Sequence, residues 1–371
     1  MYDPRMKKLA DVLVNYSIKL QKGETVYIEA FDIPVEMVEL MISAVYDAGG
    51  IPLVSQKSPR ALRRLFSGAD ETAMKLFGEV ELEKMKRSQA YIGMRGSSNT
   101  TEHSDVPADK MALYRKYWWQ PVHINWRLPR TRWVVLRWPT PSMAQLAEMS
   151  TEGFEDFYFN TTTLDYKKMS DAMDPLVKLM AKTDRVRLVA PGTDLSFSIK
   201  GIPVIKCDGH MNIPDGEVYT APVKDSVNGV IQYNTRSLYD GKIFDNMRFR
   251  YKDGKIIEAT SSDTKSMNQI LDTDEGARYV GEFAIGLNPF VTKPMLDTLF
   301  DEKIRGSFHF TPGNSYDDAF NGNRSAVHWD IVLIQTKQCG GGEIWFDDVL
   351  IRKDGIFVLD KLKGLNPENL A

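Results

Sequence analysis

The sequence contains little sulfur and little histidine. Only two cysteines, Cys207 and Cys339, and five histidines occur in 371 residues, and no C-x-x-C pair or clustered Cys/His spacing is present. A disulfide framework and a structural zinc site are therefore excluded, and a reducing compartment is expected. Because histidine is scarce, the positions of the few histidines carry information about function.

The sequence also lacks three features that would define a partner. No G-x-G-x-x-G or Walker-type glycine loop follows an expected strand, so a nucleotide site is not indicated. The first 20 residues mix charged and apolar residues at helical spacing, which predicts neither a signal peptide nor a membrane anchor but a cytoplasmic protein. A net charge of −3 gives no general attraction to nucleic acid or to a membrane surface, and we expect neither as a partner.

What is present in the first part of the chain is an alternation of helical and strand patterns. The apolar share of 43% and the length favour an ordinary globular protein of two domains. Apolar runs bounded by turn residues at 23–30, 51–56, 90–96 and 132–140 are separated by amphipathic segments. Residues 1–165 are therefore predicted to form an α/β domain with a mostly parallel sheet.

The second part of the chain changes character. A polar helical pattern at 166–183 is predicted to be a connecting helix. Beyond it, the segments 185–201, 247–259 and 344–358 alternate in polarity, and the last two turn at Asp-Gly pairs, which indicates antiparallel hairpins. Residues 184–371 are predicted to form a β-rich α+β domain that carries the chemistry.

Residues 110–147 combine basic and aromatic side chains. They contain no acidic residue, seven lysines and arginines, and five of the seven tryptophans. Such a mixture could form a stacking groove for single-stranded nucleic acid in a non-enzymatic binding protein. A buried strand with an interface or interdomain surface explains it as well, since Trp and Arg are enriched there. We favour the second interpretation because the chain is acidic overall.

The segment from His309 to Asp330 holds two of the five histidines and predicts half of a metal site. His328 and Asp330 are separated by one residue, so an extended strand would point both side chains to the same side. Tyr316 follows His309 by seven residues. Imidazole nitrogen together with carboxylate oxygen is a donor set that divalent metals accept.

Two glutamates in the same predicted domain could supply the other half of the site. Glu217 stands in HMNIPDGEVYTAP, where prolines and glycine predict an irregular backbone. Glu282 stands in YVGEFAIGLNP among apolar residues, where glycines permit close approach. A carboxylate in such surroundings is costly unless it is paired or binds a cation. A structural salt bridge or a turn hydrogen bond is the alternative for either residue alone.

The charge balance of these residues favours two metal ions. With Asp330, the two glutamates give three negative charges, which one dication would leave uncompensated. Two dications leave a charge of +1, which a hydroxide neutralises, as in a two-metal hydrolytic centre. Glu302 is a candidate general base, although an ion pair with Lys303 or Arg305 is an equally good interpretation.

The order of motifs over residues 190–332 resembles the thermophilic metalloaminopeptidases of the aminopeptidase T and aminopeptidase S type. The motifs are GTDLSFSIKG, NIPDGEVYTAP, GEFAIGLNP, LFDEKIRGSFHF and NRSAVHWD. The resemblance implies removal of N-terminal amino acids from peptides with a free N-terminus, a cytoplasmic homodimer, and two divalent ions (zinc, cobalt, manganese or magnesium). It also implies the metal ligands Glu217, Glu282, His309, Tyr316, His328 and Asp330.

Two roles and one further alternative complete the interpretation. Tyr316 could bind metal or donate a hydrogen bond to a tetrahedral oxyanion, so Tyr316 and Glu302 are the candidate catalytic residues. A metal-dependent amidase or another hydrolase acting on small polar substrates would use the same ligands. Only the aminopeptidase requires a free amino terminus on its substrate.

Overall fold

The computed structural model describes residues 3–371, which form two compact units. The first unit ends at Thr163 and also includes Gly209–Ile213, whereas the second contains Leu164–Asp208 and Pro214–Ala371. The helix predicted as a connector thus belongs to the second unit, because it packs on strands and on the C-terminal turn of that unit. The return of 209–213 to the first unit has no counterpart in the predicted boundaries 1–165, 166–183 and 184–371.

The first unit is built on a five-stranded sheet in which every pair of neighbours is parallel, as the sequence predicted. Its spatial order is β2-β1-β3-β4-β8. The strands are β1 (Thr25–Phe31), β2 (Ile51–Lys57), β3 (Ala90–Arg95), β4 (Arg132–Arg137) and β8 (Asn212–Ile213). The short fifth strand extends the sheet with a segment that is distant in sequence.

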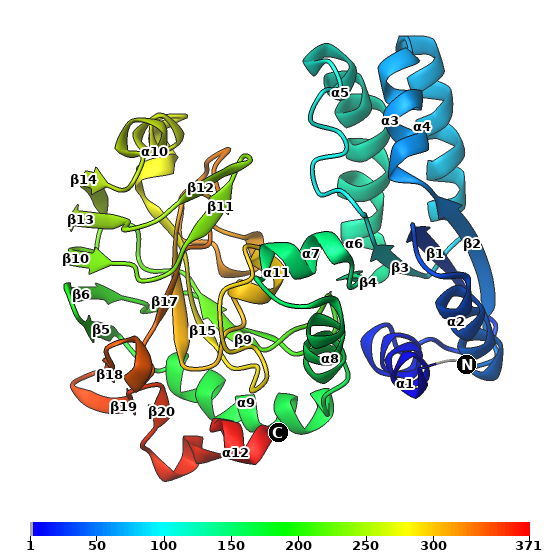
Figure 1. The fold of residues 1–371 in the computed structure, drawn as a ribbon. Coiled ribbons are helices and arrows are strands. Elements are labelled where there is room, and N and C mark those ends of the chain that lie inside the picture. The colour runs from blue at the N-terminus through cyan, green and yellow to red at the C-terminus, as the bar shows by residue number, and fades with distance from the viewer. Residues whose placement is uncertain (1–2) are drawn as a thin grey trace. The chain divides into compact units, whose positions relative to one another are not determined.

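Helices connect these strands, as parallel pairing requires. Figure 1 shows α3, α4 and α5 standing beside one another within this unit. The long π-helix η2 contains Pro121 and packs along α4. The helices are α1 (Pro4–Asp11), η1 (Val12–Ser17), α2 (Val35–Asp47), α3 (Pro59–Gly68), α4 (Glu71–Lys86), α5 (Ala108–Tyr114), η2 (Arg115–Arg127), α6 (Leu128–Arg130), α7 (Pro141–Leu146) and α8 (Thr151–Thr162).

The Trp-rich segment 110–147 contributes several aromatic rings to the core of the first unit. Trp118 is buried in a hydrophobic cluster, and Trp126 and Trp133 pack against that cluster. The Arg127 guanidinium lies over the Trp133 ring at 4.3 Å, and Arg130 lies over Trp126 at the same distance. These rings and cations are therefore engaged within the fold, as the favoured interpretation of a buried strand requires.

A buried ionic network lies under that cluster. Lys57 Nζ is 2.5 Å from Glu29 Oε1 and 2.8 Å from Glu81 Oε2, so one ammonium bridges two buried glutamates. Tyr91 donates a hydrogen bond to Glu29. Burial of the nearby His123 lowers its pKa to about 3, because the charged imidazolium loses its hydration there. The free energy of unfolding is therefore predicted to fall at acidic pH because of His123.

The second unit contains two antiparallel sheets that pack through aromatic side chains. Phe197 of one sheet lies 5.1 Å from Phe283 and 5.0 Å from Phe310 of the other, measured between ring centroids. The larger sheet has the order β14-β13-β10-β6-β5-β18-β19-β20, and several of its strands follow one another down one side of Figure 1. Its strands are β5 (Arg185–Ala190), β6 (Thr193–Ser198), β10 (Asn228–Gln232), β13 (Arg248–Lys252), β14 (Lys255–Thr260), β18 (Glu343–Phe346), β19 (Val349–Lys353) and β20 (Ile356–Phe357).

The smaller sheet has the order β17-β16-β15-β9-β7, and β11 pairs with β12 in a separate hairpin. These strands are β7 (Ile205–Cys207), β9 (Glu217–Thr220), β11 (Ser237–Tyr239), β12 (Lys242–Phe244), β15 (Val280–Gly286), β16 (Ser307–Pro312) and β17 (Val332–Ile334). The remaining helices are α9 (Tyr166–Met180), α10 (Thr264–Leu271), η3 (Glu275–Arg278), α11 (Thr298–Asp301), η4 (Asp317–Ala319), η5 (Lys337–Cys339), η6 (Asp360–Leu365) and α12 (Pro367–Leu370).

The predicted hairpin turns are present. Both residues of the pairs Asp253-Gly254 and Asp354-Gly355 have positive φ, as a type I′ turn requires. Together with the parallel first sheet, these antiparallel sheets confirm the predicted fold class.

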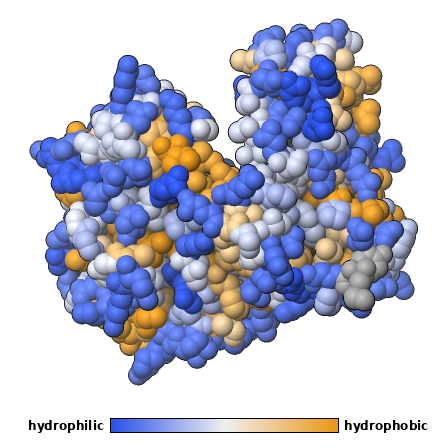
Figure 2. All heavy atoms as spheres, viewed as in Figure 1, coloured by the Kyte–Doolittle hydropathy of each residue, from blue (hydrophilic) through white to orange (hydrophobic). Residues whose placement is uncertain are grey.

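The surface is mainly hydrophilic on the face that Figure 2 shows, with apolar residues scattered over it. Scattered exposed apolar residues are normal for a folded protein. Among residues 3–371, no helix combines the length and the apolar character needed to cross a bilayer.

Candidate metal centre

The candidate site lies on the face of the smaller sheet that points away from the aromatic core. Successive side chains of a strand point to opposite faces. Phe283 on β15 and Phe310 on β16 face the larger sheet, so Glu282 and His309 face the other way. Glu217 begins β9, which pairs with β15, so Glu217 itself lies in a regular strand, and the predicted irregular backbone is confined to the residues that flank 217–220. The residues EVYT at 217–220 suit a strand with neighbours on both sides.

Small residues of β15 allow the functional side chains to approach one another. Ala284 lies opposite His309, so a small side chain faces the imidazole. Gly286 lies opposite Glu217, and a Cβ at Gly286 would come within 2.3 Å of the Ile304 carbonyl oxygen. Glycine is therefore required where β15 passes this loop.

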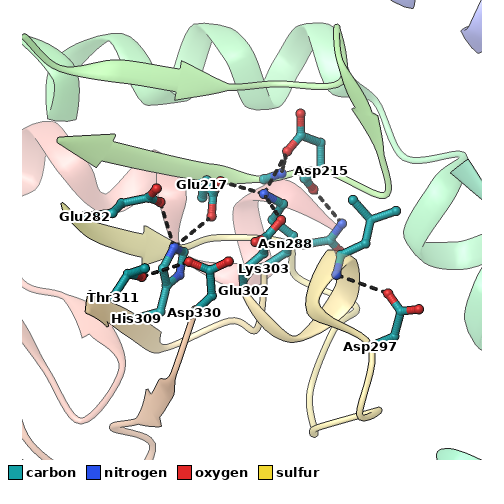
Figure 3. Close-up of polar contacts among 12 residues, drawn as sticks. Asp215, Glu217, Glu282, Asn288, Asp297, Glu302, Lys303, His309, Thr311 and Asp330 are labelled. Atoms are coloured by element: carbon teal, nitrogen blue, oxygen red, sulfur yellow. Dashed lines mark hydrogen bonds and ion pairs between the residues drawn. The ribbon is translucent and has the colours of Figure 1, made fainter. Parts of the chain in front are cut away.

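The first group of possible ligands comprises Glu217, Glu302 and His309, whose donor atoms all lie within 4.8 Å of one another. His309 is fully buried, and its Nε2 lies 3.7 Å from Glu217 Oε2. Glu302 follows helix α11 and points toward the same place, as Figure 3 shows. Residues from β9, β16 and the end of α11 thus converge on one point.

The second group comprises Glu282, His328 and Asp330, with donor atoms again within 4.8 Å of one another. His328 Nε2 lies 3.2 Å from Asp330 Oδ1 and 3.6 Å from Glu282 Oε2. The His328 Nδ1 atom lies 2.9 Å from the Asn314 carbonyl oxygen, which orients the ring. His328 forms only an isolated bridge with Gly313 and not a regular strand, yet the H-x-D pair does come together as predicted.

The two groups touch each other, and three of their atoms are left without a hydrogen bond. His309 Nε2 lies 2.9 Å from Glu282 Oε1, which joins the first group to the second. Among residues 3–371, the buried atoms Glu217 Oε2, Glu282 Oε2 and His309 Nδ1 find no hydrogen-bond partner. Buried polar atoms are seldom left unsatisfied, and a bound cation would satisfy the two carboxylate oxygens. These donor atoms therefore fit divalent metal ions.

Lys303 and Asp215 complete the polar cluster. Lys303 has no solvent exposure, and its Nζ lies 2.6 Å from Glu217 Oε1 and 2.8 Å from Glu302 Oε1. Its third ion-pair partner is Asp215 Oδ1 at 3.4 Å. Figure 3 shows these side chains pointing toward the lysine. The alternative interpretation of Glu302, an ion pair with Lys303, is therefore realised in the fold.

The pKa values report a strongly negative environment. Burial disfavours protonation of both histidines, but the neighbouring carboxylates outweigh it and raise the pKa of His309 to about 9 and that of His328 to about 10. Burial raises the pKa of Glu282, and it raises the pKa of Glu302 to about 8. Burial acts the same way on Asp330, but the His328 charge outweighs it and lowers the Asp330 pKa. Without metal, protons thus compensate part of the negative charge.

Tyr316 lies at the edge of the site. Its ring centroid is 4.6 Å from that of His328 and 6.0 Å from that of Tyr219, and 45% of its surface is exposed. Tyr316 thus borders the second group on one side and is partly exposed on the other. The candidate ligands and catalytic residues named from the sequence are thus all found in one region of the second unit.

Sequence reasoning named Lys303 only as a partner of Glu302, and it missed Asp215 and the burial of Lys303 against Glu217 and Asp215. Asp215 stands two residues before Glu217, which is a local signal that could have been used. Lys303 belongs to a charged Asp-Glu-Lys triplet, and such a triplet is ordinarily exposed.

Comparison with known proteins gives one family for nearly the whole chain. A family model described as thermophilic metalloprotease (M29) matches residues 2–355. Aminopeptidase 2 of Geobacillus stearothermophilus is 24% identical over 359 residues, which cover 85% of this chain and 84% of that protein.

Two solved structures share the fold. Wild-type AmpT from Thermus thermophilus has a TM-score of 0.80 at 21% identity, with 96% of this chain and 99% of that chain covered. A 2,5-dihydroxypyridine dioxygenase from Pseudomonas putida KT2440 has a TM-score of 0.62 at 12% identity, with 98% and 99% covered. Because both a peptidase and a dioxygenase share this fold, the fold alone does not select an activity.

Proposed function

The chain belongs to the thermophilic metalloprotease (M29) family, and from this premise we propose that it is an aminopeptidase that uses two divalent metal ions to remove N-terminal residues from peptides. Family membership makes the protein a metal-dependent peptidase and thus a hydrolase. The aminopeptidase specificity is supported by the name of the Geobacillus relative. The number of metals and the roles of individual residues are our proposal.

The observation that carries the proposal is the pair of adjoining ligand groups. Glu217 and His309 would hold one ion, with Glu302 beside it, and Glu282, His328 and Asp330 would hold the other. Each group offers the mixture of carboxylate oxygen and imidazole nitrogen that divalent ions accept. The contact between His309 and Glu282 places the two groups side by side, as a two-metal centre needs.

The buried charges support the same number of ions. With metal bound, the carboxylates of Asp215, Glu217, Glu282, Glu302 and Asp330 would all be ionised and give −5; Lys303 gives +1, and the sum is −4. Two dications bring this sum to zero when both histidines are neutral. A buried cluster that is left charged is unfavourable, so the balance supports two ions and not one.

The residues around the ions have distinct proposed roles. Bound ions supply polarisation of the scissile carbonyl and lower the pKa of water at the site. The oxygen of Glu302 that Lys303 does not hold takes the proton of the attacking water and passes it to the leaving amine. The half-exposed Tyr316 donates its hydroxyl hydrogen to the developing oxyanion. Tyr316 remains a candidate metal ligand as well.

A test of this function compares an alanine anilide with its N-acetylated form. We expect hydrolysis of the free amine only, complete loss of activity after metal removal, and recovery on adding zinc, cobalt, manganese or magnesium. Glu282→Gln is expected to lower kcat by at least ~100-fold, because even outer partners of a metal site are worth 10–100-fold. The matched control is Glu258→Gln, which removes a carboxylate paired with Arg250 on the surface and should leave activity unchanged.

Two outcomes would reject the proposal. Equal hydrolysis of the acetylated anilide would favour the alternative of a metal-dependent amidase. Activity that survives thorough metal removal would contradict a metal centre altogether. Cytoplasmic residence and a homodimer stay predictions from the family resemblance.

A further inference from the structure

Lys303 is a lysine without solvent exposure whose ammonium group lies among three carboxylates. Lysine is almost never fully buried unless it is paired. An ammonium has three N–H donors, and the three carboxylates around Nζ can take all of them. The ammonium is therefore fixed in position.

Lys303 contacts only one of the two carboxylate oxygens of Glu217 and of Glu302. Lys303 Nζ lies 2.6 Å from Oε1 of Glu217, so the other oxygen, Oε2, faces His309 Nε2 at 3.7 Å. That Oε2 atom is buried and finds no hydrogen-bond partner among residues 3–371. The same ammonium takes Oε1 of Glu302, which immediately precedes it in the chain. One cation thus ties the proposed ligand Glu217 to the proposed base Glu302.

We infer that Lys303 is a positioning residue that reserves one oxygen of Glu217 for the first metal and holds Glu302 beside it. This role of Lys303 rests on the proposed two-metal function and concerns the placement of the metal ligand Glu217 and the base Glu302. Without the ammonium, both oxygens of Glu217 become available to one ion, and the Glu302 carboxylate is free to turn. An ion held by both oxygens of Glu217 would have a higher coordination number, and the Glu302 carboxylate would no longer be held beside it.

A plain counter-ion is the competing explanation, and the chain allows the two to be separated. In Lys303→Met the cluster charge changes from −4 to −5. Adding Asp215→Asn restores −4 without restoring the tether, because Asp215 is the most distant of the three partners, at 3.4 Å. If Lys303 acts only as a counter-ion, the second substitution should restore the wild-type properties. If Lys303 positions Glu217 and Glu302, it should not.

The experiment uses the full chain loaded with two equivalents of Co(II), whose visible absorption weakens as its coordination number rises. We expect Lys303→Met to bind two Co(II), to absorb more weakly than wild type, and to lose about 10- to 100-fold in kcat with little change in KM. The Lys303→Met/Asp215→Asn protein should show the same spectrum and the same loss. If Lys303→Met does not fold, the double variant supplies the measurement.

The control is Arg305→Met, since this exposed cation donates to the Pro289 carbonyl oxygen and should leave spectrum and kcat unchanged. A wild-type spectrum in Lys303→Met, or recovery of spectrum and kcat in the double variant, would overturn the positioning role. Wild-type protein that binds fewer than two Co(II) or lacks aminopeptidase activity would instead contradict the proposed function. The two failures are therefore distinguishable.

Discussion

Metal binding by this centre should expel about three protons per chain at pH 7, two from the histidines and one from Glu302, whose pKa is raised to about 8 in the metal-free protein and whose carboxylate is ionised in the proposed metal-loaded site. In the metal-free protein the pKa of His309 is raised to about 9 and that of His328 to about 10, because hydrogen bonds and charges of the neighbouring carboxylates outweigh burial. Two and three pH units below these values, both rings are almost fully protonated. A ring nitrogen must lose its proton before it can bind a metal, so each histidine contributes one proton.

The sign and size of the pH dependence follow from the same values. Deprotonating both rings at pH 7 costs about 7 kcal/mol of the intrinsic metal-binding free energy, at ~1.4 kcal/mol for each pKa unit. This cost shrinks as the pH rises and disappears above about pH 10. With the Glu302 proton included, apparent affinity for two ions should therefore rise with pH, by up to ~1000-fold per pH unit near neutrality.

Isothermal titration calorimetry of the metal-free protein measures this release directly. Titrations with zinc at pH 7 in two buffers of different ionisation enthalpy give the number of protons released, and a series at higher pH should show the number falling. His103→Gln is the control, because His103 lies in the first unit against the Pro59 carbonyl oxygen and should not change the count. Release near zero at pH 7 would refute the electrostatic account of the cluster.

Three further predictions concern stability and packing. Burial lowers the His123 pKa to about 3, so the unfolded chain binds an extra proton below pH ~6.5. The free energy of unfolding should therefore be about 2 kcal/mol lower at pH 5 than at pH 7. In His123→Phe this difference should vanish when unfolding is followed by tryptophan fluorescence. Lys57→Met should lower the free energy of unfolding by about 3–5 kcal/mol in urea titrations, because two buried glutamates lose their cation, and a loss below ~1 kcal/mol would contradict this. Gly286→Ala should lower the free energy of unfolding by about 1–3 kcal/mol and impair metal binding, because the new methyl group meets the Ile304 carbonyl oxygen. The control Gly68→Ala, which has open space around it, should change neither property.

The proposed ligands were accessible from the sequence because they depend on local patterns. Glu282 and His309 occupy strands whose alternate residues are aromatic or aliphatic, so the functional face follows from the register of each strand. His328 and Asp330 needed only the spacing of two residues in an extended segment. Their convergence required the family resemblance, since strand pairing across large separations is not written in any one segment.

Other features depend on contacts that no local pattern encodes. Lys303 is buried only because Glu217, 86 residues earlier in the chain, supplies a carboxylate at 2.6 Å. The two-residue strand β8 is too short to show any periodicity. The turn between β18 and β19 uses Asp347-Asp348, both at positive φ, where the expected signal is Asp-Gly. Asp347 is favoured there because its side chain accepts hydrogen bonds from two backbone N–H groups.

Two metal ions held in adjoining groups of one chain are the basis of the proposed function. Crystals of the zinc-loaded protein, measured with X-rays at the zinc absorption edge, test it most directly through an anomalous difference map. We expect two peaks per chain, one between Glu217 and His309 and the other among Glu282, His328 and Asp330. A single peak, or peaks away from these side chains, would contradict it.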